Sequence, residues 1–107
     1  MSVRLEMLQV ARLATKSLGE SSDLVESFVR SKQNADGGFA DRDGKSDLYY
    51  TTFAIDALTA LQVELPIESL RAFLESFGNG DGLDFVHLCC LARNWSAIEK
   101  NHSCIEP

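Results

Sequence analysis

The stretch QNADGGFADRDGKSDLYYT, residues Gln33–Thr51, decides the fold because it places glycine-rich turns between two segments with helical periodicity. Asn34, Gly37 and Gly38 tolerate the positive φ angles that a sharp reversal between helices requires. No strand pattern precedes these glycines and no Gly-Lys-Ser/Thr follows them, which argues against a phosphate-binding loop. The stretch therefore predicts the joint between an outgoing helix and a returning helix.

The side chains around this joint have expected structural roles. We expect Asp36 to cap backbone N–H groups, Phe39 to fold back as an apolar plug, and Asp47 to cap the returning helix. Asp41, Asp43 and Asp47 resemble part of a calcium loop, but the bidentate Glu of such loops is missing, which favours a solvated, capped loop. The predicted structural residues of the turn are Gln33, Asp36, Gly37, Gly38, Phe39 and Asp47.

The apolar spacing of the whole chain predicts an all-α protein with five helices and no strand. The expected helices are residues 2–18, a helix capped by Ser22 or Asp23, Asp47–Leu61, a helix that follows Pro66 and ends at Gly78, and Leu83–Trp95. Ser96–Glu99 has the pattern of a capping box, which suggests that a sixth helix begins there. No segment shows the alternation of a half-buried strand.

The chain contains an internal repeat. SFVRSKQNADGG, residues 27–38, aligns with AFLESFGNGDGL, residues 72–83, at an offset of 45 residues. After the turns the offset falls to 37 residues, so that Asp47 aligns with Asp84, Tyr50 with His87 and Leu58 with Trp95. Each unit is an outer helix, a glycine turn and an inner helix, with a period of about 45 residues typical of repeat arrays. The predicted units are residues 23–62 and 68–98, and helix 2–18 belongs to a preceding, incomplete unit.

The composition limits the classes of function. With 107 residues, the chain forms one domain, and its net charge of −6 disfavours nucleic acid and anionic membranes as partners. No apolar run approaches the roughly 18 residues of a transmembrane helix. The N-terminus reads as an amphipathic helix, so it does not predict a signal peptide. Three cysteines, two of them adjacent, do not form a disulfide framework, which favours a reducing, cytoplasmic location.

FVRSKQNADGGF resembles the repeat of the prenyltransferase and squalene–terpene cyclase superfamily, and GGFADRDGKSDLYYTTFAIDAL is most similar to the β subunits of protein prenyltransferases. The resemblance covers Phe28–Leu61 well and Phe73–Trp95 weakly. It implies stacked antiparallel helical hairpins forming part of an α/α toroid, whose inner helices line an apolar cavity for an isoprenoid. Tyr49, Tyr50, Phe53 and His87 are then the candidate cavity-lining residues, although the three aromatic residues are equally suited to a core between helices.

The catalytic motifs of this superfamily are incomplete here. Tyr50 stands where the transferases place a zinc-binding His, and tyrosine is a poor zinc ligand at neutral pH. The companion Asp-x-Cys pair and the Asp-x-Asp-Asp acid motif of the cyclases are absent from the sequence. His87 occupies the matching position in the second unit, and a zinc set with Cys90, His102 and Cys104 is the alternative. Small inward cysteines more often fill a core, so we expect no catalytic residues, metal or other cofactor.

The sequence therefore predicts one partial toroid-repeat domain over residues 1–107. Its expected function is that of a fragment or degenerate relative of isoprenoid-handling, transferase-like enzymes, and a non-catalytic helical-repeat module that binds protein or lipid is the alternative. Repeat units bury their faces on neighbours. Val86, Leu91 and Trp95 at one open end, and Val3, Met7 and Ala11 at the other, are expected to lack partners. We therefore expect the chain to self-associate through these ends, to aggregate, or to be only marginally stable.

Overall fold

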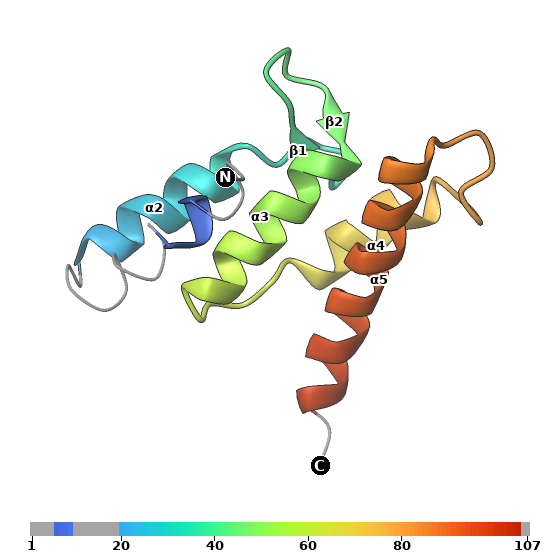
Figure 1. Cartoon of the computed structure of the whole chain (residues 1–107). Helices are drawn as coiled ribbons and strands as arrows, with labels where there is room; N and C mark the ends of the chain where they lie inside the picture. The colour runs from blue at the N-terminus through green and yellow to red at the C-terminus, as the bar shows by residue number, and fades with distance from the viewer. Residues whose placement is uncertain (1–5, 10–19, 106–107) are drawn as a thin grey trace.

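The computed structural model describes residues 6–9 and 20–105 and is mostly helical (Figure 1). A short helical segment covers residues 6–9. It is followed by α2 (Glu20–Ser31), β1 (Phe39–Ala40), β2 (Ser46–Asp47), α3 (Leu48–Ala60), α4 (Ile67–Glu75) and α5 (Phe85–Ile105). The helices agree with the all-α prediction. None of the helices in this part of the chain is both long and apolar enough to cross a membrane.

Helix α3 lies at the centre of the molecule, with α2 on one side and α4 and α5 on the other (Figure 1). Asp47 precedes the helix in extended conformation, and its Oδ2 accepts a hydrogen bond of 2.9 Å from the Tyr50 backbone N–H, as the sequence predicted. Apolar residues occur all round α3, which is typical of a helix covered on several sides. Its buried residues are Leu48, Thr51, Thr52, Phe53, Ala54, Ile55, Ala57 and Leu58.

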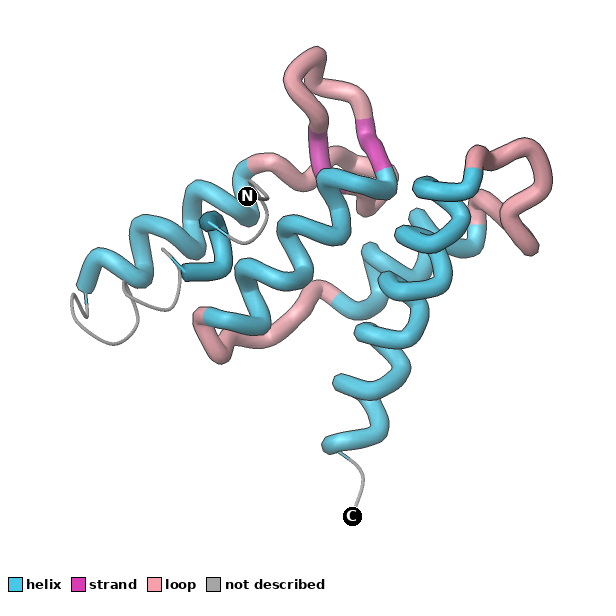
Figure 2. The backbone as a smooth tube through the Cα atoms, viewed as in Figure 1, coloured by secondary structure: helices cyan, strands magenta, loops and turns pink. Residues whose placement is uncertain are grey.

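The prediction that the chain has no strand is wrong. β1 and β2 form an antiparallel pair in which Phe39 faces Asp47 and Ala40 faces Ser46 (Figure 2). The hairpin loop is closed by a 2.8 Å hydrogen bond from the Asp41 N–H to the Lys45 carbonyl, and Gly44 adopts φ +83°. Strands of two residues are too short to produce a readable alternation of polar and apolar residues.

The glycine turn between α2 and α3 confirms the predicted reversal. Gly37 has φ +94°, and the Gly38 N–H donates a 2.9 Å hydrogen bond to Asp36 Oδ1. The Gln33 side chain donates to the Gly37 carbonyl at 2.9 Å. Phe39 is fully buried and its N–H donates to the Thr51 hydroxyl, so the aromatic plug is fixed to α3.

Helix α4 packs directly on this turn. A Cβ added to Gly37 would lie 1.9 Å from the Ser69 carbonyl oxygen, and one added to Gly38 would lie 2.6 Å from the Phe73 ring. Glycine is therefore required at both positions because a side chain would collide with α4. At Gly37 it is also required because the φ angle is positive. The contact joins the glycine turn of the first unit to the outer helix of the second.

The predicted sixth helix does not form, because α5 continues through Ser96 and Glu99 to Ile105. Leu91, Asn94 and Ile98 lie three and four residues apart and are all buried, so one continuous stripe carries the helix past the capping-box pattern. The expectation that Leu91 and Trp95 lack partners is also wrong. Leu91 belongs to the core and Trp95 packs against it, whereas Val86 is exposed.

The start of the chain is described in part. Residues 6–9 are helical, and the other positions of the predicted helix 2–18, including Val3 and Ala11, lie outside the described residues. Helix α2 begins at Glu20, so the two predicted caps, Ser22 and Asp23, lie inside its first turn. Boundaries of this kind are the least reliable part of a sequence-based assignment.

Candidate functional site: an aromatic pocket beside the central helix

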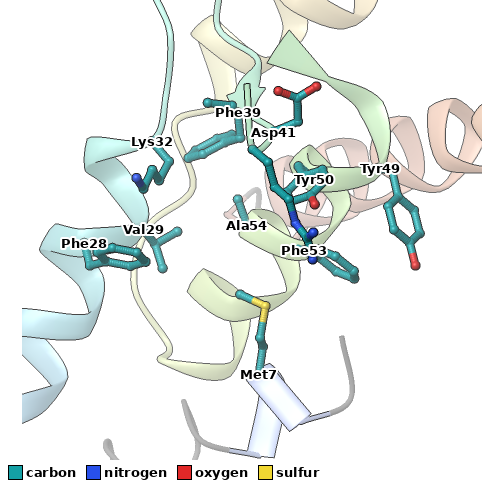
Figure 3. A pocket seen from close by; sticks show the side chains of 12 residues that line it. Met7, Phe28, Val29, Lys32, Phe39, Asp41, Tyr49, Tyr50, Phe53 and Ala54 are labelled. Atoms are coloured by element: carbon teal, nitrogen blue, oxygen red, sulfur yellow. The ribbon is translucent and has the colours of Figure 1, made fainter. Parts of the chain in front are cut away.

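An open pocket of about 510 Å³ lies between α2, the β1 end of the hairpin and α3 (Figure 3). Such a volume falls within the range of ligand pockets, roughly 300–1,000 Å³. Met7 and Asp41 lie at opposite ends of it, and Phe28 and Val29 of α2 face Phe53 of α3 across it (Figure 3). The described lining residues are Met7, Phe28, Val29, Lys32, Phe39, Ala40, Asp41, Arg42, Tyr49, Tyr50, Phe53 and Ala54.

Three of the predicted cavity-lining residues form one aromatic cluster on α3. The ring centroids of Tyr49 and Phe53 are 4.7 Å apart, and those of Tyr50 and Phe53 are 5.7 Å apart. The cluster exists because positions 49, 50 and 53 are neighbours on a helical surface. Tyr49 is exposed, Tyr50 is half-buried and Phe53 is buried, so the cluster runs from the pocket wall out to solvent.

The pocket has an apolar wall and a charged rim. Lys32 Nζ lies 5.2 Å from the centroid of the Phe28 ring, a cation–π distance, and Arg42 is an exposed lining residue. Asp41 is the one carboxylate among the described lining residues. Its Oδ1 accepts hydrogen bonds from the N–H groups of Asp43 and Lys45, so this carboxylate holds the hairpin loop. The rim therefore presents two cationic side chains and an acid engaged by backbone donors.

The fourth predicted cavity residue, His87, lies elsewhere. It is in the first turn of α5, with Nδ1 2.8 Å from Asp84 Oδ1 and Nε2 3.3 Å from Asp47 Oδ1. Both aspartates are helix caps. Asp47 accepts from the Tyr50 N–H at the start of α3, and Asp84 accepts from the His87 N–H at 2.8 Å at the start of α5. The hydrogen bond to Asp84, and then the one to Asp47, raise the pKa of His87 above 6.5, while His87 lowers the pKa of Asp84. His87 therefore joins two helix caps and does not contribute to the pocket.

Metal-ligand chemistry is not assembled in the described part of the chain. No group of three or more His, Cys, Asp or Glu side chains there is placed to hold a metal ion. Cys90 is buried beside α3, and burial raises the pKa of its thiol, which disfavours the thiolate that zinc requires. The side chains of His102 and Cys104 lie outside the description. Of the calcium candidates, Asp41 and Asp47 accept hydrogen bonds from backbone amides.

Sequence reasoning missed the half of the pocket that α2 supplies. Phe28 aligns with Phe73 in the repeat, which suggested the same structural role for both. Phe73 is 4% exposed because it packs on the glycine turn of the first unit, but Phe28 is 61% exposed. The repeat pattern does not distinguish the two phenylalanines, because burial depends on the surface that packs opposite each one.

Sequence reasoning also missed a buried polar cluster between α3 and α5. The Thr52 hydroxyl lies 2.8 Å from Asn94 Oδ1, and Asn94 Nδ2 donates to the Leu48 carbonyl at 3.3 Å. These groups satisfy one another, and no buried side-chain N or O among the described residues lacks a hydrogen-bond partner. The cluster fixes the register of the two inner helices, because sliding either helix would leave these polar groups unpaired.

Comparison with protein-family models, with curated proteins and with solved structures found no match to this chain. Its function is therefore argued from the geometry of its own residues.

Proposed function

We propose that this chain is a helical-repeat protein of the prenyltransferase and terpene-cyclase kind that binds an isoprenoid or similar apolar chain in the aromatic pocket. The supporting observation is the pocket itself, with Phe28 and Val29 on one wall and Tyr50 and Phe53 on the other. Aromatic and aliphatic walls suit a branched, unsaturated hydrocarbon, because such walls offer large contact areas without polar groups that need a partner.

The proposed activity is binding, and no catalytic step is assigned. His87 is engaged with Asp47 and Asp84, and Asp41 is engaged with backbone amides, so neither is poised as a general acid or base in the pocket. The repeat sequence supports the relationship to isoprenoid-handling enzymes, and the aromatic lining supports the class of ligand. The alternative is a non-catalytic helical-repeat module that binds protein or lipid on its surface instead of in this pocket, and a ligand titration separates the two.

The test is a titration of the isotopically labelled protein with farnesol, followed by backbone amide NMR. We expect saturable shifts concentrated at residues 28–32, 39–42 and 49–54. Straight-chain dodecanol, which is apolar but unbranched, serves as the comparison ligand and should bind more weakly. Farnesol-induced shifts that do not saturate, or that spread evenly over the surface, would refute the proposal and favour the module hypothesis.

Two variants make the test specific. Tyr49→Ser removes an exposed ring from the pocket. Ala72→Ser is its control, because Ala72 lies on the exposed side of α4 and is not a lining residue. Loss of one aromatic contact worth about 1 kcal/mol corresponds to a roughly fivefold higher Kd. The control should bind as the unchanged protein does. Equal weakening by both variants would show that binding does not occur in the pocket.

A further inference from the structure

The two repeat units make one junction inside the chain, and it shows how one unit covers the next. On the inner helices, Asn94 of α5 covers Leu48 and Thr52 of α3 through the buried polar cluster. On the outer side, Phe73 of α4 covers the glycine turn at Gly37. Each unit therefore offers one face of its inner helix and its glycine turn to the unit that follows.

The second unit has the same face, and its described residues are exposed. Leu48 is 1% exposed, whereas Phe85, which stands 37 residues later at the equivalent position, is 79% exposed. Cys89, the equivalent of the buried Thr52, is exposed as well. A Cβ added to Gly82, the equivalent of Gly37, meets no atom within 4 Å. We define this C-terminal surface by Phe85, Val86 and Leu88, which are all exposed apolar residues.

The opposite end of the molecule carries the complementary surface. Phe28 is the equivalent of Phe73, and Leu24 stands 45 residues before Ser69, which contacts Gly37. Both Leu24 and Phe28 are exposed. They lie on α2, whereas the C-terminal surface lies on α5, on the far side of α3 (Figure 1). The first unit therefore exposes the surface that packs on a preceding unit, and the second unit exposes the surface on which a following unit would pack.

We propose that these surfaces bind each other head to tail, so that the N-terminal surface of one copy, Leu24 and Phe28, packs on the C-terminal surface of a second copy. The charges favour this pairing. Exposed Lys32 lies over the Phe28 ring and exposed Arg42 lines the same pocket, whereas exposed Asp84 directly precedes Phe85 in the chain and exposed Asp81 lies in the turn before it. Head-to-head contact would bring the cations together and tail-to-tail contact the aspartates, which like-charge repulsion disfavours. Head-to-tail contact between copies produces rings or open chains.

The new junction is not an exact copy of the internal one. Leu83 replaces Gly38 in the second turn, and a Cβ at Gly38 would lie 2.6 Å from the Phe73 ring. Phe28 of the incoming copy therefore sits farther from the turn than Phe73 does, against Phe85 and Leu88. Phe28 also lines the ligand pocket, so association is measured without ligand.

The experiment is light scattering after gel filtration, over a wide range of concentration, with two single-end variants. Phe28→Asp blocks the N-terminal surface, and Phe85→Asp blocks the C-terminal surface. We expect the unchanged chain to exceed its monomer mass of 11.8 kDa as concentration rises. Each variant alone should remain a monomer, with association weakened at least tenfold. Their equimolar mixture should form a one-to-one dimer, because one intact surface of each kind remains. High salt should weaken the dimer, since charge contributes to it.

Several results would overturn the proposal. A monomeric unchanged chain at every concentration would do so, and so would a mixture of the two variants that stays monomeric. Normal association of Phe28→Asp would indicate that two C-terminal surfaces bind each other. Normal association of Phe85→Asp would indicate that two N-terminal surfaces do. Ala72→Asp, on the exposed side of α4, is the charge-matched control and should associate normally. Circular dichroism verifies that each variant folds. If Phe28→Asp or Phe85→Asp unfolds, Leu24→Asp and Val86→Asp serve as a second pair that blocks the same two surfaces.

Discussion

Replacing Gly37 by alanine tests whether the close contact between α4 and the first glycine turn stabilises the fold. The added Cβ would lie 1.9 Å from the Ser69 carbonyl oxygen, which is backbone and cannot rotate away. Alanine at φ +94° costs about 1 kcal/mol of strain, and separating α4 from the turn costs a further 1–3 kcal/mol, roughly as in overpacked cores. We expect Gly37→Ala to lower the free energy of unfolding by about 3 kcal/mol.

The matched control is Gly82→Ala in the second unit. Gly82 has φ +88°, but a Cβ there meets no atom within 4 Å, so this substitution carries the strain without the collision. We expect a loss of about 1 kcal/mol, so that the two variants differ by about 2 kcal/mol. Urea unfolding of dilute protein, followed by the fluorescence of Trp95, the single tryptophan, measures both values. Equal losses at the two glycines would refute the claim that α4 needs Gly37 for close packing.

Three further predictions concern α5. Because the folded pKa of His87 lies above 6.5, its pairing with the two capping aspartates stabilises the fold below pH 6.5, and this stability is lost as pH rises through the folded pKa. His87→Asn should remove that part of the pH dependence of urea unfolding. Asn94→Ala should cost about 2 kcal/mol, because it removes two buried hydrogen bonds and the packing of the Asn94 side chain, although the Thr52 hydroxyl can still donate to the Leu48 carbonyl. Ser96→Ala on the exposed face should change the urea midpoint little. In a Cys104→Ser background, Ellman's reagent should modify exposed Cys89 faster than buried Cys90, and a fast phase that persists after Cys89→Ser is added would contradict this.

Much of the local structure could be read from the sequence, because caps and glycine turns depend on a few neighbouring residues. Asp47 caps α3 as expected, since a carboxylate three residues before a free backbone N–H reaches it without help from the rest of the fold. Gly37 adopts the expected positive φ, and Asp36 caps the turn. The repeat was also readable, because equivalent contacts preserve residue types at a fixed spacing.

Burial and the pocket could not be read in the same way, because they depend on which surface lies opposite a residue. Phe28 and Phe73 align in the repeat, yet Phe28 is exposed and Phe73 is buried, since Phe73 packs on the glycine turn at Gly37 and Gly38. Leu91 and Trp95 were expected to be uncovered, but contacts with the core bury the first and partly bury the second.

The sequence by itself determined the helices, the glycine reversals and the order of the two units, because hydrogen bonding and backbone conformation in these elements are local. The tertiary structure decided three other matters. It extended α5 past the Ser96 capping pattern, since burial of Ile98 outweighs a local signal for the start of a new helix. It placed His87 between two caps instead of in the pocket, because the ring lies where α3 and α5 begin side by side. It left Phe28 and Phe85 exposed although the aligned residues Phe73 and Leu48 are buried, since burial depends on the surface that packs opposite each residue.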